Sequence, residues 1–171
     1  MSGEVVRGCR RIVICGIPGA GKTWLGNELS KKLGLPVYHM DEDFGKYLGQ
    51  GDIESRKPVI LGKIDEVSGG AEWIIDGNYP SHTEAFAVRA CRADLVLYLN
   101  FPIDFCVESI RRRGVANGEP SENVEALVDR VQNYAPLCEK MAEQITKIAG
   151  DKVIELRSRA EVEKFLKGVG R

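Results

Sequence analysis

The sequence predicts an α/β fold: a mostly parallel sheet of about five strands whose connecting helices cover both faces. Five short apolar runs alternate along the chain with segments in which apolar residues recur every three or four positions. Such alternation is typical of doubly wound sheets with right-handed crossovers. The chain has 171 residues, 43% of them hydrophobic, which is enough for one α/β domain with a core and too few for two.

The strands are expected where the apolar runs fall, at residues 11–15, 35–39, 73–76, 95–100 and 152–156. The first of these runs is apolar and largely β-branched after Arg11, as a strand buried on both faces requires. A helix should follow it, because three leucines recur at helical spacing: Leu25, Leu29 and Leu33. Gly34 and then Pro36 predict its end.

The second half of the chain is predicted to be mainly helical. Apolar residues spaced by three and four over residues 122–147 indicate an amphipathic helix, interrupted near Pro136. The last helix should begin with a capping box, Ser158 with Glu161 three positions on, and run to about Leu166. Two segments rich in glycine and polar residues are expected to be mobile loops: residues 45–52 and 114–121.

Residues 16–23 read G-I-P-G-A-G-K-T and form a complete G-x-x-x-x-G-K-T motif between the first strand and the first helix. Backbone N–H groups in such a loop, together with the helix N-terminus, surround a phosphate group. Lys22 would reach the β- and γ-phosphates of ATP, and the Thr23 hydroxyl would hold Mg²⁺. The plainer alternative is a glycine-rich turn with a surface lysine. The predicted ATP contacts are Gly16, Pro18, Gly19, Ala20, Gly21, Lys22, Thr23 and Trp24.

Carboxylates follow the second and third strands, at the sheet edge where ligands bind in doubly wound folds. Asp41 and Asp43 could each orient or deprotonate an acceptor hydroxyl, or form only a solvated acidic turn, and the sequence leaves their division of labour open. Asp76 is placed to support Mg²⁺, with a turn-forming Asp-Gly pair as the alternative. His39 and His82, far apart in the sequence, are expected to have separate roles rather than to form a histidine–carboxylate dyad.

Basic residues supply candidates for closing over the transferring phosphoryl group. The run Arg111-Arg112-Arg113 precedes a glycine-rich loop, so we expect a lid in which Arg111 and Arg113 contact the phosphates. A solvated basic turn is the alternative. Arg157 is expected near the adenine, and the acceptor contacts are expected at Asp41, Asp43, Arg56, Asn78 and Arg89.

Charge and composition limit the kinds of partner that the chain is expected to bind. The net charge is −1, so no overall basic field disposes the chain to bind nucleic acid or an anionic membrane. The five cysteines show no C-x-x-C spacing and are expected to be reduced core residues of a cytoplasmic protein. No apolar segment is long enough to span a bilayer, and residues 1–10 are too polar for a signal peptide. We expect a monomer or a weak homodimer.

In these motifs the chain resembles the adenylate-kinase-like branch of P-loop kinases, and most closely the FlaR-like family of DNA topology modulation proteins. The matching segments are residues 16–23, 33–41, 73–79, 101–102 and 156–158, with Arg89, Asp94 and Cys106. The resemblance implies a three-layer P-loop NTPase fold with strand order 2-3-1-4-5. It also implies a substrate-binding segment at about residues 41–72 and a short lid at about 111–122. The family's usual lid arginine aligns with Ser109, which leaves the arginines at 111–113 for that role.

The sequence therefore predicts an ATP- and Mg²⁺-dependent kinase that acts on a small acceptor bearing a hydroxyl or phosphate group, such as a nucleotide, nucleoside or metabolite. The alternative is a regulatory NTPase that couples ATP binding or hydrolysis to a protein or DNA partner. The identity of the acceptor is not encoded in any motif that we recognise.

Overall fold

The structure is a computed structural model that describes residues 6, 8–44, 53–77 and 83–169. At its centre lies a five-stranded parallel sheet made of β1 (Arg11–Gly16), β2 (Val37–His39), β3 (Trp73–Asp76), β4 (Leu95–Leu99) and β5 (Val153–Leu156). The strand order is β2-β3-β1-β4-β5, and every neighbouring pair is parallel. The predicted fold class and strand order are confirmed, and each strand lies within one or two residues of its predicted bounds.

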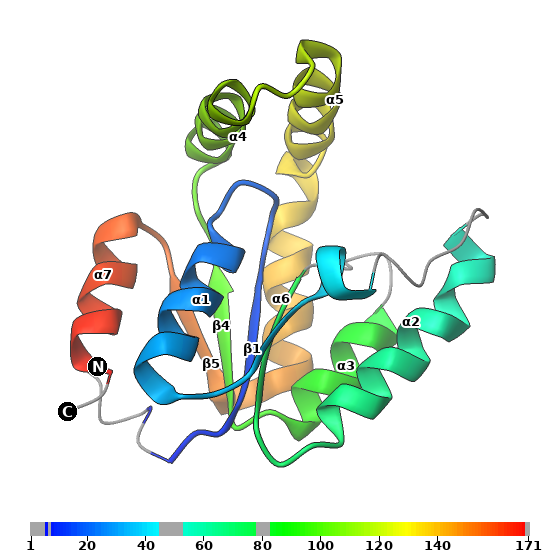
Figure 1. Ribbon diagram of the computed structural model, residues 1–171, viewed down its shortest axis with the longest axis vertical. Coiled ribbons are helices and arrows are strands. Elements are labelled where there is room, and N and C mark those ends of the chain that lie inside the picture. Colours follow the sequence, from blue (N-terminus) through cyan, green and yellow to red (C-terminus); the bar gives the residue numbers. More distant parts are fainter. Residues whose placement is uncertain (1–5, 7, 45–52, 78–82, 170–171) are drawn as a thin grey trace.

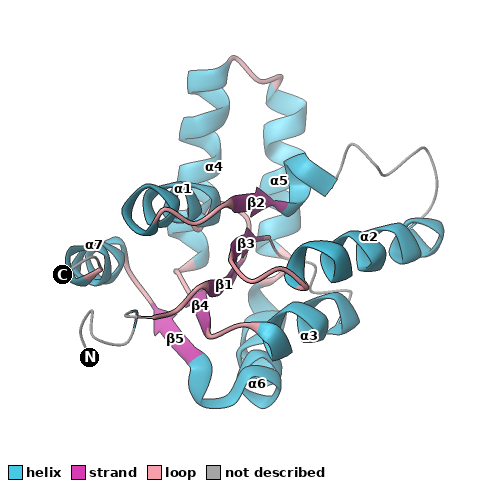
Figure 2. Ribbon diagram, turned by 60° about the horizontal axis from the view of Figure 1, so that its bottom comes forward, coloured by secondary structure: helices cyan, strands magenta, loops and turns pink. Residues whose placement is uncertain are grey.

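Helices cover both faces of the sheet (Figures 1 and 2). One face carries α1 (Lys22–Leu33) and α7 (Arg159–Gly168), and the other carries α3 (Thr83–Arg92) and α6 (Cys138–Ala149), with α2 (Ile53–Ser68) packed against α3. Beyond the carboxyl end of the sheet stand α4 (Ile103–Asn117) and α5 (Ser121–Gln132), side by side. We call these two helices the lid hairpin, after the lid that the sequence predicts at about residues 111–122.

The central strands form the core because their residues are apolar on both faces. Ile12, Val13, Ile14 and Cys15 of β1 are completely buried, and the residues of β3 and β4 are at most 3% exposed. The first helix stops as predicted: Gly34 adopts φ +71° and donates its N–H to the Ser30 carbonyl oxygen at 2.8 Å. No helix in the described part of the chain combines the length and the apolar character needed to cross a bilayer.

The predicted break near Pro136 is confirmed, because α5 ends at Gln132 and a short turn at Ala135–Leu137 separates it from α6. Ser158 caps the last helix as predicted, because its Oγ accepts a hydrogen bond from the Glu161 N–H at 3.3 Å. The other half of the capping box differs: the Glu161 carboxylate accepts from the Arg157 N–H at 2.8 Å rather than from Ser158. The predicted mobile loop at 114–121 is wrong for its first half, since α4 continues to Asn117. Gly114 is buried there, and a Cβ on it would collide with the Val124 side chain. This glycine therefore allows α4 and α5 to pack closely instead of breaking the helix. The predicted loop at 45–52 lies outside the described residues.

Candidate active site

The phosphate-loop motif occupies the turn between the carboxyl end of β1 and the start of α1, as predicted. Two of its glycines are required by close contacts. Gly16 adopts φ +146°, and a Cβ there would lie 2.5 Å from the Leu99 carbonyl oxygen on β4. Gly19 adopts φ +85°, and a Cβ there would collide with the Cys106 carbonyl oxygen in α4. The loop is thus packed tightly against the first helix of the lid hairpin.

Lys22 lies at the first position of α1, half-buried rather than freely exposed. Its Nζ donates a hydrogen bond to the Ile17 carbonyl oxygen at 3.1 Å, which keeps the ammonium group over the loop. Burial lowers the pKa of Lys22, while the nearby charges of Asp41 and Asp76 act in the opposite direction. The ammonium group therefore lies within electrostatic reach of two carboxylates, and it has three N–H donors with which to bind phosphate oxygens.

Asp76 ends β3 next to the loop and is 3% exposed. Its Oδ2 accepts a hydrogen bond from His39 Nδ1 at 2.8 Å, and the neighbouring Thr23 side chain lowers the pKa of the carboxyl. Burial raises the pKa of Asp76, and the hydrogen bond from His39 opposes that rise. The expectation of separate roles for the histidines is wrong for His39, because the parallel register of β2 and β3 pairs it with Asp76. His82 lies outside the described residues.

A hydroxyl and a carboxylate side by side are the hard oxygen donors that Mg²⁺ prefers, so Thr23 and Asp76 fit the predicted metal. Most of the coordination sphere of Mg²⁺ usually comes from water and substrate phosphates, and two protein donors beside a phosphate loop are enough. The described residues contain no cluster of three or more His, Cys, Asp or Glu side chains that could hold a metal ion by themselves.

The turn after β2 separates the roles of its acidic residues. Met40–Phe44 form a single wide helical turn, and the Asp43 carboxylate accepts a hydrogen bond from the His39 backbone N–H at 2.7 Å. Asp41 and Glu42 instead line the cavity above the phosphate loop. Asp43 therefore shapes the turn, and the structure brings Asp41, not Asp43, to the loop.

A cavity of about 560 Å³ lies between the phosphate loop, the lid hairpin and the start of α7. The carboxylates and the cations that line this cavity come from different elements. Carboxylates come from the ends of β2 and β3, at Asp41, Glu42 and Asp76. Cations come from α1, the lid hairpin and α7, at Lys22, Arg112, Arg113, Arg130 and Arg159. Such a cationic wall matches a polyphosphate in charge.

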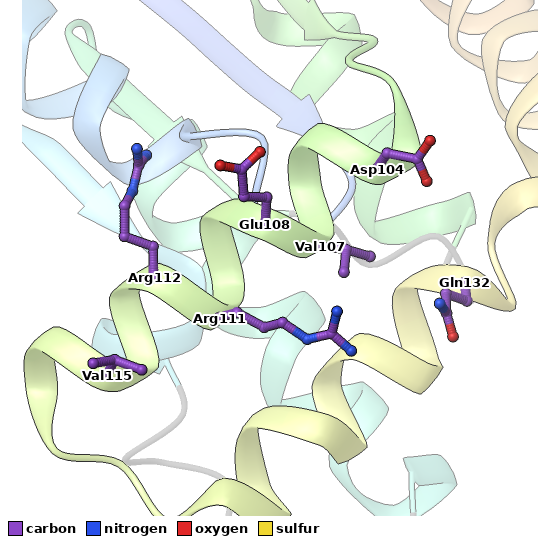
Figure 3. A pocket seen from close by; sticks show the side chains of 7 residues that line it. All are labelled: Asp104, Val107, Glu108, Arg111, Arg112, Val115 and Gln132. Carbon is purple, nitrogen blue, oxygen red and sulfur yellow. The ribbon is translucent and has the colours of Figure 1, made fainter.

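Arg113 lies in this cavity as predicted, but Arg111 does not. Arg111 turns toward α5 and donates from Nε and Nη2 to the Glu125 carboxylate at 3.0 and 2.8 Å. Figure 3 shows Arg111 and Arg112 leaving α4 in different directions, with Arg112 pointing away from α5. Adjacent residues on a helix do not face the same way. The prediction for Arg111 is therefore corrected to Arg112, which lines the phosphate cavity.

Arg157 is also displaced from its predicted position. Its side chain is exposed and donates to the Glu155 carboxylate at 2.8 Å, and it does not line the cavity. Two residues further on, the Arg159 guanidinium lies 4.0 Å from the centre of the Trp24 ring, and both side chains line the cavity. Sequence reasoning missed Arg159 and Arg130. Both are ordinary exposed helix residues whose direction depends on helix packing.

The predicted acceptor contacts are only partly brought together. Arg89 is completely buried in α3, where Nη2 donates to the Gly77 carbonyl oxygen at 2.8 Å and Nη1 to Met40 Sδ at 2.6 Å. Its guanidinium holds the chain just after β2 and β3 from within the core and does not line the cavity. The predicted role of Arg89 as a substrate contact is therefore corrected to a structural one. Asn78 lies outside the described residues. Arg56 belongs to α2, but the described part of the structure does not extend to its side chain.

Comparison with known proteins finds kinases of low sequence identity. No family model matches the chain. The adenylate kinase of Mycolicibacterium smegmatis is 27% identical over 157 residues, covering 78% of this chain and 84% of the relative. A putative adenylate kinase of Pyrococcus furiosus is 31% identical over 126 residues, covering 69% of this chain and 64% of the relative. These relatives do not test the FlaR-like resemblance, which stays a prediction.

Among solved structures, the shikimate kinase of Acinetobacter baumannii in complex with shikimate superposes with a TM-score of 0.64. It is 17% identical, with 96% of this chain and 93% of the other covered, so the likeness concerns the fold. The chain is therefore a low-identity homologue of adenylate-kinase-like P-loop kinases, with a fold that shikimate kinase shares.

Proposed function

We propose that the protein is an ATP- and Mg²⁺-dependent phosphotransferase that acts on a small acceptor bearing a hydroxyl or phosphate group. The observation that carries this proposal is the segregation of charge within one cavity. Cations from the phosphate loop and the lid hairpin face carboxylates from the ends of β2 and β3. Phosphoryl transfer needs this arrangement, since its catalysis is mainly positioning and charge stabilisation.

Each wall of the cavity has a role in this proposal. Lys22 and the lid arginines Arg112, Arg113 and Arg130 bind the triphosphate and the transferring group. Thr23 and Asp76 hold Mg²⁺, which neutralises charge on the phosphate oxygens when it is bound. Trp24 and Arg159 present a stacked aromatic and guanidinium surface to the nucleotide base or ribose.

Asp41 is the group left to orient the acceptor. It is exposed on the cavity wall, and its charge acts on Lys22, so the carboxylate lies toward the phosphate end of the site. A carboxylate there can accept the proton of an acceptor hydroxyl as that oxygen attacks the γ-phosphate. We place this reaction in the cytoplasm, where buried thiols such as those of Cys15 and Cys106 stay reduced. The expectation that all five cysteines are core residues holds for these two, whereas Cys91 is exposed.

The proposal is tested by ADP formation against a panel of nucleoside monophosphates, nucleosides and small hydroxy acids, with Mg²⁺ present. We expect at least one acceptor class to accelerate ADP formation in the native protein and to become phosphorylated. Lys22→Ala protein serves as the control for contaminating kinases. ADP formation that no acceptor changes would favour the regulatory NTPase and contradict the proposal.

A second expected result concerns metal dependence. ATP with Mg²⁺ should raise the melting temperature, because a ligand that binds only the folded state stabilises it by mass action. At a hundred times Kd the stabilisation is about 2.7 kcal/mol, or roughly 5–10 °C for a chain of this length. Thr23→Val and Asp76→Asn should each shrink the shift. An equal shift with ATP in excess EDTA would show that Mg²⁺ takes no part.

A further inference from the structure

Three side chains from three elements form a connected hydrogen-bonded path beside the phosphate loop. Asp76, at the end of β3, is its first member, and the Thr23 side chain of α1 lies beside that carboxylate. His39 Nδ1, at the end of β2, lies 2.8 Å from Asp76 Oδ2. Its Nε2 lies 3.3 Å from Oδ1 of Asn27, a residue of α1. The path therefore joins the ends of β3 and β2 to α1, the helix that also carries Thr23.

The backbone makes this arrangement possible. Thr23 and Asn27 are four residues apart on α1, so their side chains project from the same face, one turn apart. His39 and Asp76 are register partners on adjacent parallel strands. Between the helix and the strands sits Gly26, where a Cβ would lie 3.2 Å from Val37 Cγ2 and 3.5 Å from Asp76 Oδ2. The missing side chain of Gly26 lets α1 approach the carboxylate closely.

Two side chains of the path are well shielded from water. The side chain of Asp76 is 4% exposed and that of His39 is 14% exposed. An ionised carboxylate only accepts hydrogen bonds, so Nδ1 of His39 carries the hydrogen that it donates to Asp76. With Oδ2 engaged in this way, rotation of the carboxylate about its Cβ–Cγ bond would break a short, buried hydrogen bond.

We propose that His39 is a positioning residue, which fixes the Asp76 carboxylate beside the Thr23 hydroxyl so that the two oxygens together receive the Mg²⁺ of the bound nucleotide. The proposal rests on the proposed function only in assuming that a Mg²⁺–nucleotide complex binds here. Partners that orient a metal ligand typically change metal affinity by about 10–100-fold when they are removed. His39 has no direct contact with the nucleotide in this role.

The two nitrogens of His39 can be separated by substitution. Asparagine places an amide nitrogen close to the position of Nδ1, whereas glutamine places one near the position of Nε2. If the hydrogen bond to Asp76 positions the metal ligand, His39→Asn should preserve most of the gain in ATP affinity that Mg²⁺ provides. His39→Gln and His39→Ala should both lose that gain. Ser30→Ala is the matched control, since Ser30 Oγ donates to the Leu35 carbonyl oxygen at 2.6 Å and links the same helix to the chain before β2 without touching the path.

The measurement is calorimetric titration of ATP into the full-length protein, once with Mg²⁺ and once with EDTA. The ratio of the two dissociation constants reports the metal's contribution without requiring turnover. We expect His39→Ala and His39→Gln to reduce this ratio by about tenfold or more, with ATP affinity in EDTA changed less than about twofold. His39→Asn and Ser30→Ala should keep the ratio of the unsubstituted protein.

Several outcomes would overturn the inference. One is an unchanged ratio in His39→Ala. Another is an equal loss of affinity with and without Mg²⁺, which would indicate a purely structural role. A third is failure of His39→Asn to restore the ratio, and a fourth is an unsubstituted protein whose ATP affinity Mg²⁺ does not change. A normal ratio in a protein that phosphorylates no acceptor would count against the proposed function alone.

Discussion

Lys22→Ala should lower ATP turnover by about 10²–10³-fold while leaving the folded structure in place. The side chain stands at the first position of α1 and is only half-buried, and its Nζ donates to the Ile17 carbonyl oxygen of the loop itself. When a nucleotide binds, the ammonium group can exchange that carbonyl for phosphate oxygens carrying full negative charge. Removal of the ammonium group takes charge stabilisation from the transition state and leaves no core cavity.

ADP formation by Lys22→Ala protein measures this effect, and Lys31→Ala is its matched control. Lys31 belongs to the same helix and forms only an exposed ion pair with Glu28, so its removal should change neither turnover nor melting temperature appreciably. Unchanged turnover in folded Lys22→Ala protein would contradict the assignment of the phosphate loop. A large drop in melting temperature without nucleotide would show instead that Lys22 is mainly structural.

The nucleotide side of the site could be predicted from the sequence because its chemistry is local. Eight consecutive residues between a strand and a helix contain the whole phosphate loop, and the buried strand before them fixes where the loop lies. Asp76 was predictable for a similar reason, since it directly follows an apolar run. In both cases position along the chain determines position in the sheet.

The lid could not be predicted to the residue, because the direction of an exposed side chain depends on how its helix is rotated. Arg111 and Arg112 are neighbours in the sequence, yet Arg111 pairs with Glu125 and Arg112 faces the phosphate cavity. Gly114 misled the prediction in a related way. Its sequence context indicated a loop, whereas its actual role is to let α5 approach α4 at Val124.

Contacts between residues far apart in the sequence account for the remaining differences between prediction and structure. His39 and Asp76 are 37 residues apart, and only the register of β2 against β3 brings them within hydrogen-bond distance. Arg89 is another case, because an arginine in a polar helical pattern indicates an exposed cation. Its complete burial follows from the carbonyl oxygen of Gly77 and the sulfur of Met40, which lie where β3 and β2 end.

Asp41→Asn is expected to separate acceptor-dependent transfer from nucleotide binding. The carboxylate lies on the cavity wall opposite the cationic lid, and Asp43 is occupied by the His39 backbone N–H. Asparagine keeps the shape of aspartate but has no negative charge with which to accept the proton of an acceptor hydroxyl. ATP affinity should therefore change little, while acceptor-dependent turnover falls by roughly a hundredfold or more.

Three measurements on Asp41→Asn distinguish the possible roles: ATP affinity with Mg²⁺, ATP affinity in EDTA, and turnover with the acceptor found in the panel. Asp43→Asn is the comparison variant, expected to weaken the turn after β2 and lower the melting temperature more than it lowers turnover at a temperature where it is folded. If Asp41→Asn instead weakens Mg²⁺–ATP binding as strongly as Asp76→Asn does, Asp41 belongs to the metal and Asp43 becomes the better candidate for the acceptor. If acceptor-dependent turnover survives Asp41→Asn unchanged, the acceptor hydroxyl needs no carboxylate from this turn, because positioning against the γ-phosphate by the cationic lid is then sufficient for transfer.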